Sequence, residues 1–396
     1  MQQFGTDLTH LGTRIDLGTQ AIPKVAPIVM SGAFEFDTPE DLEAANRNEI
    51  VGYSYGRDGS VTSDCARDIL TALDGGEISE IFPSGMAAIS CTLMSLLKTG
   101  DHIIMSSVIF GTTYNMIVWQ LSKRYGIEVD IVDMFEDDLE AHFKPNTKVV
   151  FLEAISNPMV AVADLQKISD IAHHHGAKVV VDSTFATPIV CRPIDFGVDF
   201  VVYSATKFLN GHSDIMCGAA VLRDKSDFKA LADQRRIFGK NISPFDAFLL
   251  TRSLRTLEVR MHVHCNNAMR LARFLSEERG LPVRYSGLEN DPFHEIAKKQ
   301  FNEGMFGGMV NLDLGTYEKA MNVARTLKLV KLVPSLGCLT TTISDTRTSH
   351  SSMSAEERRK SKIGDGMLRI SVGLETIEDI IADFDQALTA VEDSRA

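Results

Sequence analysis

Residues 178–207 read KVVVDSTFATPIVCRPIDFGVDFVVYSATK, and this stretch decides the fold class. It contains two short runs of mainly apolar residues, Lys178–Asp182 and Asp199–Tyr203. Runs that are nearly continuously apolar, without polar alternation, are typical of strands covered by helices on both faces. Polar residues follow each run, at the strand ends where open α/β sheets place their ligands. The stretch therefore predicts two strands of a buried sheet with chemistry at their carboxyl ends.

Five more runs of this kind surround that stretch. They are Ile78–Phe82, His102–Ser106, Glu128–Val132, Lys148–Leu152 and Gly218–Leu222. Helical segments are predicted in the gaps at Met86–Lys98, Thr113–Tyr125 and Leu165–His175. Strands that alternate with helices predict an α/β fold with a mostly parallel, seven-stranded sheet in a large domain.

The pattern changes after Pro244 to long amphipathic helices, predicted at Phe245–Leu257 and Val263–Arg279. Mixed short strands and a closing helix at Glu378–Val391 follow, which predicts a smaller C-terminal α+β domain. The polar segment Thr340–Lys362 is expected to be a loop, either functional or merely solvated.

The composition favours a small-molecule enzyme. The 396 residues are 44% hydrophobic and carry a net charge of −13, which argues against surfaces for nucleic acid or anionic membranes. No segment approaches the roughly 20 apolar residues of a membrane span. The six cysteines form no C-x-x-C pair and are expected to be reduced and mostly buried. We therefore expect a cytoplasmic protein with no metal site, no nucleic-acid partner and no membrane partner.

The strongest local signal is the group Ser204, Thr206 and Lys207 directly after a predicted strand. A lysine held at a strand end can be desolvated enough to form a Schiff base with an aldehyde cofactor. Taken alone, a lysine after a strand is more often exposed and solvated.

Asp182 is the second signal, because it ends the neighbouring apolar run 25 residues before Lys207. If the aldehyde is pyridoxal phosphate, a carboxylate there would keep the pyridine nitrogen protonated. The alternative is a helix N-cap after a strand. A third signal is the turn around Gly85 and Met86, where a strand passes into a helix whose N–H groups suit a phosphate. Alone, this turn could be an ordinary helix cap.

With these residues in this order, the chain resembles the pyridoxal-phosphate enzymes of cysteine and methionine metabolism, the family of cystathionine gamma-lyase, cystathionine gamma-synthase and methionine gamma-lyase. The resemblance covers nearly the whole chain, and methionine gamma-lyases look most similar. The motifs that carry it are Tyr55-Gly56-Arg57, Ser84-Gly85-Met86, the run Ser204–Asp214, Ser335-Leu336-Gly337 and the run Arg369–Glu375.

The resemblance implies fold type I of these enzymes, and it assigns the site. Lys207 would carry pyridoxal phosphate and shuttle protons, with Asp182 on the pyridine nitrogen. Ser335 and Arg369 would bind the substrate, with Arg369 gripping its carboxylate. The remaining cofactor contacts would come from Tyr55, Arg57, Gly85, Met86, Phe110, Asn157, Ser204 and Thr206.

The resemblance also implies an assembly. Tyr55 and Arg57 would reach into the site of a neighbouring subunit, in a dimer that usually pairs into a homotetramer. The implied organisation is an N-terminal arm over residues 1–60, a cofactor-binding domain over 61–250 and a C-terminal domain over 251–396.

The chain departs from the family pattern around the substrate's γ-substituent. Phe110 stands where these enzymes have a tyrosine stacked on the cofactor, and Thr112 stands where methionine gamma-lyases carry cysteine. Arg235-Arg236 replaces a Lys-Asp pair, and Ser60-Val61-Thr62 replaces Asn-Pro-Thr. The segment Cys338–Ser349 also diverges. A phenylalanine can stack on the cofactor ring but cannot donate a proton, so these departures affect the choice of leaving group and leave the cofactor and carboxylate contacts unchanged.

These observations predict a γ-lyase that eliminates the γ-substituent of a four-carbon amino acid. The substrate would resemble methionine, homocysteine or cystathionine, or would carry an oxygen leaving group as in canavanine or an O-acylhomoserine. A γ-replacement synthase is the alternative enzyme. A catalytically silent subunit that only binds the cofactor or serves in assembly is the alternative from another class.

Overall fold

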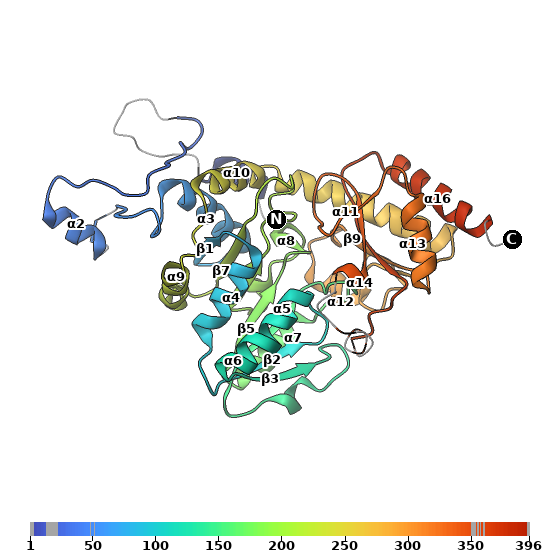
Figure 1. Ribbon diagram of the computed structural model, residues 1–396, viewed down its shortest axis with the longest axis horizontal. Helices are drawn as coiled ribbons and strands as arrows, with labels where there is room; N and C mark the ends of the chain where they lie inside the picture. Colours follow the sequence, from blue (N-terminus) through green and yellow to red (C-terminus); the bar gives the residue numbers. More distant parts are fainter. Residues whose placement is uncertain are drawn as a thin grey trace.

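The computed structural model describes residues 4–12, 23–47, 49–50, 52–349, 354, 356, 358 and 361–393. Its larger sheet has seven strands in the order β1-β7-β6-β5-β4-β2-β3 (Figure 1). The strands are β1 (Ile78–Phe82), β2 (His102–Ser106), β3 (Glu128–Val132), β4 (Thr147–Glu153), β5 (Lys178–Asp182), β6 (Phe200–Tyr203) and β7 (Gly218–Leu222). Strand β7 runs antiparallel to both of its neighbours, and the remaining pairs are parallel. The predicted mostly parallel α/β sheet is confirmed.

Helices cover both faces of this sheet, which explains the nearly continuous apolar strands. In β5, the side chain of Val180 packs into one core, and Val179 and Val181 pack into the other. Because successive strand residues point to opposite faces, a strand buried on both sides needs apolar residues at every position. One face is covered by α4 (Gly85–Leu96) and α9 (Phe228–Ile237), and the other by α3 (Val61–Asp74), α7 (Leu165–His174), α10 (Pro244–Leu254) and α11 (Leu257–Arg273).

A second sheet of five strands has the order β10-β11-β12-β9-β8. Its strands are β8 (Val283–Arg284), β9 (Met309–Asp313), β10 (Lys331–Leu332), β11 (Thr342–Asp345) and β12 (Met367–Ser371). Apolar residues of α11, α13 (Tyr317–Thr326) and α16 (Ile377–Asp393) form a separate core with it (Figure 1). Strand β12 matters for function because it carries Arg369.

Two local predictions need correction. Residues 342–345 of the predicted polar loop form the buried strand β11, whose Ser344 pairs with Arg369 of β12. Threonine and serine can occupy a buried strand when the ladder hydrogen bonds satisfy the backbone, and hydropathy does not signal this. Within the same predicted loop, residues 350–353, 355, 357, 359 and 360 lie outside the described residues. The predicted helix Thr113–Tyr125 contains a π-helical stretch at Met116–Ser122.

The shorter helical segments complete the described chain. They are α1 (Phe4–His10), α2 (Pro39–Asn46), α5 (Gly111–Asn115), η1 (Met116–Ser122), α6 (Lys123–Tyr125), η2 (Leu139–His142), α8 (Thr187–Val190), η3 (Pro193–Phe196), η4 (Lys225–Asp227), η5 (Phe274–Glu278), α12 (His294–Gln300) and α14 (Thr346–Ser349). None of the helices in the described ranges is long and apolar enough to span a membrane.

The N-terminal part of the chain is divided between the body and an extension. Helix α1 buries Phe4 and Leu8 in the main core. The described residues between 23 and 60, which we call the arm, include α2 and reach well away from the body (Figure 1). The domain limits at residues 60 and 250 stay predictions, and residue 250 lies within α10.

Candidate active site

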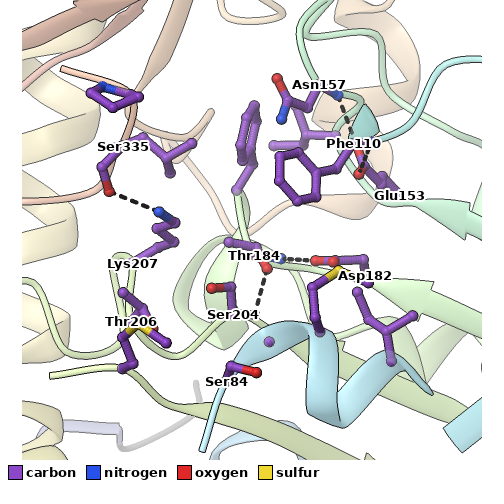
Figure 2. A pocket seen from close by; sticks show the side chains of 18 of the residues that line it. Ser84, Phe110, Glu153, Asn157, Asp182, Thr184, Ser204, Thr206, Lys207 and Ser335 are labelled. Carbon is purple, nitrogen blue, oxygen red and sulfur yellow. Dashed lines mark hydrogen bonds between the residues drawn. The ribbon is translucent and has the colours of Figure 1, made fainter. Parts of the chain in front are cut away.

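A cavity of about 250 Å³ lies where the carboxyl ends of β4, β5 and β6 meet the loop before α4 and the second sheet (Figure 2). Ten of the twelve residues that the sequence assigned to the site line it. They are Gly85, Met86, Phe110, Asn157, Asp182, Ser204, Thr206, Lys207, Ser335 and Arg369. The fold thus brings together residues that are up to 284 positions apart in the chain, because the strand ends of the large sheet face β12 of the second sheet across the cavity.

Lys207 reaches into this cavity from the segment that follows β6. Its Nζ donates a hydrogen bond of 2.7 Å to Ser335 Oγ, and Figure 2 shows the two side chains pointing at one another. Burial, together with the nearby charge of Arg369, lowers the pKa of Lys207 to about 8. A lysine with this pKa is deprotonated more readily near neutral pH than a solvated one, which is what an amine nucleophile or general base requires.

The Ser335 loop is held against Lys207 by close packing. Gly337 has a φ of +68°, and a Cβ there would lie 2.6 Å from the backbone nitrogen of Phe208. Its own N–H donates to Ser371 Oγ at 2.8 Å. Only glycine allows this approach without displacing the Lys207 segment, so the loop has a fixed position relative to the amine.

Asp182 ends β5, is buried and lines the cavity. Its Oδ1 accepts a hydrogen bond of 2.9 Å from the Thr184 backbone N–H, and Thr184 Oγ1 accepts one of 2.8 Å from the Ser204 N–H. Burial raises the pKa of Asp182, and the hydrogen bonds from Thr184 oppose that rise. A buried carboxylate in this position favours a cationic partner in the cavity.

The N-terminus of α4 forms the other end of the cavity. Ser84 caps the helix by accepting a hydrogen bond from the Ala87 N–H, whereas the first N–H groups, at Gly85 and Met86, have no acceptor within a helix. A Cβ at Gly85 would lie 2.7 Å from Ser204 Cβ, so only glycine lets the Ser204 segment pack this closely against the start of α4 at this corner of the cavity. The helix end and the neighbouring hydroxyl of Ser204 suit a phosphate group. The hydroxyl of Thr206 is hydrogen-bonded to the backbone of Cys217.

Arg369 approaches from the second sheet with only 4% of its surface exposed. Its Nη1 donates to Asn157 Oδ1 at 3.0 Å, and its Nη2 donates to the carbonyl oxygen of Ser335 at 3.4 Å. Burial lowers the pKa of Arg369 to about 10, which leaves it charged at neutral pH. A fixed guanidinium that faces the cavity is suited to bind a carboxylate.

Glu153 is a cavity residue that the sequence analysis missed. It ends β4 directly beside Asp182, and its Oε1 and Oε2 accept hydrogen bonds of 2.8 and 2.7 Å from the N–H groups of Phe110 and Asn157 (Figure 2). Burial and the charge of Asp182 raise the pKa of Glu153. The available signal was an acidic residue at the end of an apolar run, as for Asp182, but the predicted strand stopped at Leu152.

Tyr55 and Arg57 are the two predicted site residues that do not line the described cavity of their own chain. Both belong to the arm and are exposed, and the Arg57 guanidinium lies 5.2 Å from the centre of the Tyr55 ring.

The cavity fits the predicted cofactor at three points. Lys207 would bond to the aldehyde, Asp182 would face the pyridine nitrogen, and the N–H groups at the start of α4, beside the Ser204 hydroxyl, would hold the phosphate. Phe110, whose ring points into the cavity, is available to stack on the cofactor ring (Figure 2).

Comparisons with known proteins identify the family of the chain. The family model described as "Cys/Met metabolism PLP-dependent enzyme" matches residues 5–389. The chain is 39% identical over 400 residues to an L-methionine gamma-lyase of Fusobacterium nucleatum subsp. polymorphum, with 98% of both chains covered. It is 36% identical over 389 residues to cystathionine beta-lyase MetC of Bacillus subtilis, covering 98% of this chain and 96% of that one.

Solved structures give the same result for the fold. A putative O-acetylhomoserine (thiol)-lyase of Campylobacter jejuni superposes with a TM-score of 0.92 at 30% identity, covering 98% of this chain and all of that one, and it carries a pyridoxyl-lysine-phosphate. Cystathionine gamma synthase of Xanthomonas oryzae superposes with a TM-score of 0.91 at 32% identity over the whole of both chains. With its fold, its cavity and these relatives in agreement, this chain belongs to the pyridoxal-phosphate-dependent enzymes of cysteine and methionine metabolism.

Proposed function

We propose that this enzyme is a γ-lyase, which removes the γ-substituent of a four-carbon L-amino acid and, with consumption of one water molecule, releases 2-oxobutanoate, ammonia and the protonated leaving group. The observation that carries the proposal is that one cavity contains both a desolvated amine, Lys207, and a buried guanidinium, Arg369. The 39% identity to an L-methionine gamma-lyase over 98% of the chain supports the same reaction class.

Each of these residues has a definable task. Arg369 holds the substrate carboxylate, and the hydrogen bond to Asn157 fixes the guanidinium in the orientation that this requires. When bound, pyridoxal phosphate supplies a conjugated ring that takes up electrons as bonds at the substrate's α-carbon break. Lys207 takes the proton from the α-carbon and moves protons to and from the β-carbon, while the hydroxyl of Ser335 orients its amine.

The lining of the cavity supports a leaving group that needs little help from a protein acid. Phe110 presents an apolar ring, and Phe185, Pro334 and Leu336 add further apolar surface. None of these side chains can donate a proton, so an acylated or otherwise acidic γ-oxygen, or a leaving group protonated by solvent, suits this site best. Methionine and cystathionine remain competing substrates, because Lys207 itself can carry a proton.

A γ-replacement synthase is the second candidate, and two solved relatives favour it. The neighbours from Campylobacter jejuni and Xanthomonas oryzae are named as a (thiol)-lyase of O-acetylhomoserine and as a cystathionine gamma synthase. In that reaction a thiol takes the place of the departing γ-substituent, and Arg369 and Lys207 keep the same tasks.

We also propose that the active unit is a dimer that shares its sites, and that two dimers form a tetramer. The exposed residues Tyr55 and Arg57 support this arrangement. They do not line the cavity of their own chain, so their side chains are available to contact the cofactor in the cavity of a neighbouring subunit. Sedimentation of the purified protein tests the assembly directly. A cytoplasmic location is proposed as well, since all six cysteines are free thiols, as expected in a reducing compartment.

A product time course by NMR separates the two enzyme candidates. L-Methionine, L-cystathionine, O-acetyl-L-homoserine and L-canavanine are supplied one at a time, each with and without an added thiol. Release of 2-oxobutanoate without thiol supports the γ-lyase and identifies its leaving group. Turnover that requires the thiol and yields a thioether overturns the γ-lyase in favour of the synthase. The Lys207→Ala variant is the control for reaction outside the cavity.

A further inference from the structure

Arg235 of α9 joins the arm to the body of the chain. Its Nη1 donates a 2.6 Å hydrogen bond to the carbonyl oxygen of Arg57, and its Nη2 donates one of 2.9 Å to that of Asp58. Its Nη1 also donates to Asn241 Oδ1 at 3.1 Å. Arg235 is 7% exposed. A buried arginine that donates to two successive arm carbonyls therefore fixes the backbone at this point.

Glu80 of β1 neutralises this buried cation. Its Oε2 lies 2.9 Å from Arg235 Nε, and its Oε1 accepts a hydrogen bond of 3.0 Å from the Ile81 N–H. Arg67 of α3 is 3.8 Å from the same Oε1. Because Glu80 is only 3% exposed, removing either partner would leave a charge buried without adequate compensation. The arm is thus tied to β1, the strand that leads into the Gly85 corner of the same chain's cavity.

The carbonyls that Arg235 binds lie at the end of the turn that displays Tyr55 and Arg57. The Asp58 N–H donates to the Tyr55 carbonyl at 2.8 Å, and the Gly56 N–H donates to that of Gly32 at 3.0 Å. Both hydrogen bonds that Arg235 donates to this turn go to backbone carbonyl oxygens and not to side chains. It therefore sets the direction of the turn and leaves the side chains of Tyr55 and Arg57 available.

We propose that Arg235 is a positioning residue that orients Tyr55 and Arg57 toward the phosphate end of the cavity in a partner subunit. The inference rests on the proposed shared site. An arginine is needed because its planar fork reaches two carbonyls and Glu80 at once, whereas a lysine has a single nitrogen. Loss of the fork is expected to weaken cofactor binding in the partner's cavity, not in the cavity of the altered chain.

The Arg235→Lys variant tests this, because it keeps the charge beside Glu80 and loses the fork. We expect its apparent dissociation constant for pyridoxal phosphate to rise about tenfold, as for the loss of one or two hydrogen bonds to a charged group. Mixing it with Lys207→Ala chains supplies intact arms to its intact cavities. At limiting cofactor, borohydride reduction followed by mass spectrometry then counts labelled Arg235→Lys chains, since Lys207→Ala chains cannot be labelled at that position. Labelling that returns toward the wild-type level supports the proposal.

Labelling that mixing does not restore overturns the proposal, and so does unchanged cofactor affinity in Arg235→Lys. Arg57→Ala, mixed in the same way, separates the two levels of inference. If mixing rescues Arg57→Ala but not Arg235→Lys, the shared site stands and Arg235 has no role in it. If mixing rescues neither, the shared site itself fails.

Two further variants guard against misfolding and nonspecific effects. Lys229→Gln, on the same helix, changes a residue that pairs with Asp233 at the surface, and it should bind cofactor like the wild type. If Arg235→Lys does not fold, the double variant with Arg235→Gln and Glu80→Gln removes both buried charges together and enters the same mixing experiment. Rescue is again expected, and its absence overturns the proposal.

Discussion

The cavity and the arm differ in how their polar side chains are satisfied. In the cavity, Arg369 is 4% exposed and bound by Asn157, and both carboxylate oxygens of Glu153 accept backbone hydrogen bonds. In the arm, Tyr55 is 49% exposed and stacks with the exposed Arg57. Buried polar groups must be paired within the fold, whereas exposed ones are paired by water until a partner replaces it.

This contrast distinguishes the cavity, which a single chain forms, from the contacts of the arm, which would form only in an assembly of two chains. The cavity already holds the amine, the carboxylate and the guanidinium at set positions, so changes there should affect chemistry and stability together. The arm has its backbone fixed by Arg235 but its side chains in solvent. Changes to those side chains should affect cofactor affinity and leave the folding of the chain unaltered.

The largest effect is expected from Lys207→Ala. Loss of the amine should lower kcat by roughly 10²- to 10⁴-fold, because general acid and base catalysis at the α-carbon disappears. The measurement is steady-state release of 2-oxobutanoate at saturating substrate, with cofactor in excess. Lys229→Ala, at the surface of α9, is the matched control and should retain wild-type kcat. Residual turnover within tenfold of wild type would show that Lys207 does not move the proton.

Arg57→Ala should raise the dissociation constant for pyridoxal phosphate by about 10- to 100-fold, as expected for a lost hydrogen bond between a charged group and phosphate. The Tm of the cofactor-free protein should stay within error of the wild type, since Arg57 is exposed. Absorbance titration and thermal unfolding of the same preparation give both values. A large fall in Tm would show that Arg57 stabilises the fold, as the buried cavity residues do, and would contradict its assignment to cofactor binding alone.

Glu153→Gln should lower both the stability of the fold and the catalytic efficiency, kcat/KM. A glutamine turns its NH₂ group toward one of the two backbone N–H donors, leaving that donor unpaired at a cost of about 1–3 kcal/mol in the free energy of unfolding. Phe110 and Asn157 would then shift, and kcat/KM should fall about tenfold or more. Chemical denaturation and steady-state kinetics measure the two effects. Altered stability with unchanged kcat/KM would limit Glu153 to a structural role.

The pH dependence of cofactor binding tests the environment of Lys207. Only the neutral amine attacks an aldehyde, so the association rate should rise about tenfold per pH unit below the pKa of about 8 and level off above it. Stopped-flow absorbance on the cofactor-free protein measures this rate. Arg369→Met removes a nearby positive charge that lowers this pKa, so the midpoint should move to higher pH. A midpoint near that of a solvated lysine would contradict the burial of the amine.

The pKa of Lys207 also affects folding in a direction that can be checked. Its folded pKa of about 8 lies below the unfolded value, so between these values the native state binds fewer protons than the unfolded state. The free energy of unfolding of the cofactor-free protein should therefore rise from about pH 8 toward pH 10, relative to that of Lys207→Met. Parallel curves for the two proteins would contradict the lowered pKa.

Phe110→Tyr should have the smallest effect. A phenol in this position could protonate a departing thiolate, so kcat with methionine should rise several-fold, whereas kcat with O-acetylhomoserine should change little. Comparing the two substrates in one assay cancels any effect on folding. An equal change for both would show that the ring acts by stacking alone.

Much of the fold was predictable because it depends on local patterns. The bounds of Ile78–Phe82, Lys178–Asp182 and Gly218–Leu222 match the structure, since strands buried on both faces leave uninterrupted apolar runs. Strand β11 escaped prediction because its sequence, Thr-Ile-Ser-Asp, is mostly polar. Its burial follows from pairing with β12, which is distant in the sequence.

The site residues likewise fall into those that local sequence patterns reveal and those whose role depends on contacts between distant segments. Lys207 and Asp182 stood out because each follows an apolar run, and the resemblance to a family then placed the other residues. Glu153 gave a similar local signal, but its importance depends on the two N–H donors that face it, 43 positions before and 4 positions after it in the chain. Such a convergence cannot be seen from spacing alone.

By itself, the sequence determined the α/β class, most strands of the large sheet and the strand-end candidates Lys207 and Asp182, because apolar periodicity and strand-end chemistry are local properties. Only the tertiary structure decided that Arg369 meets Asn157, that Ser335 meets Lys207 and that Glu153 lines the cavity. The physical reason is that burial and charge pairing depend on which segments fold against one another, and a linear pattern does not contain those contacts.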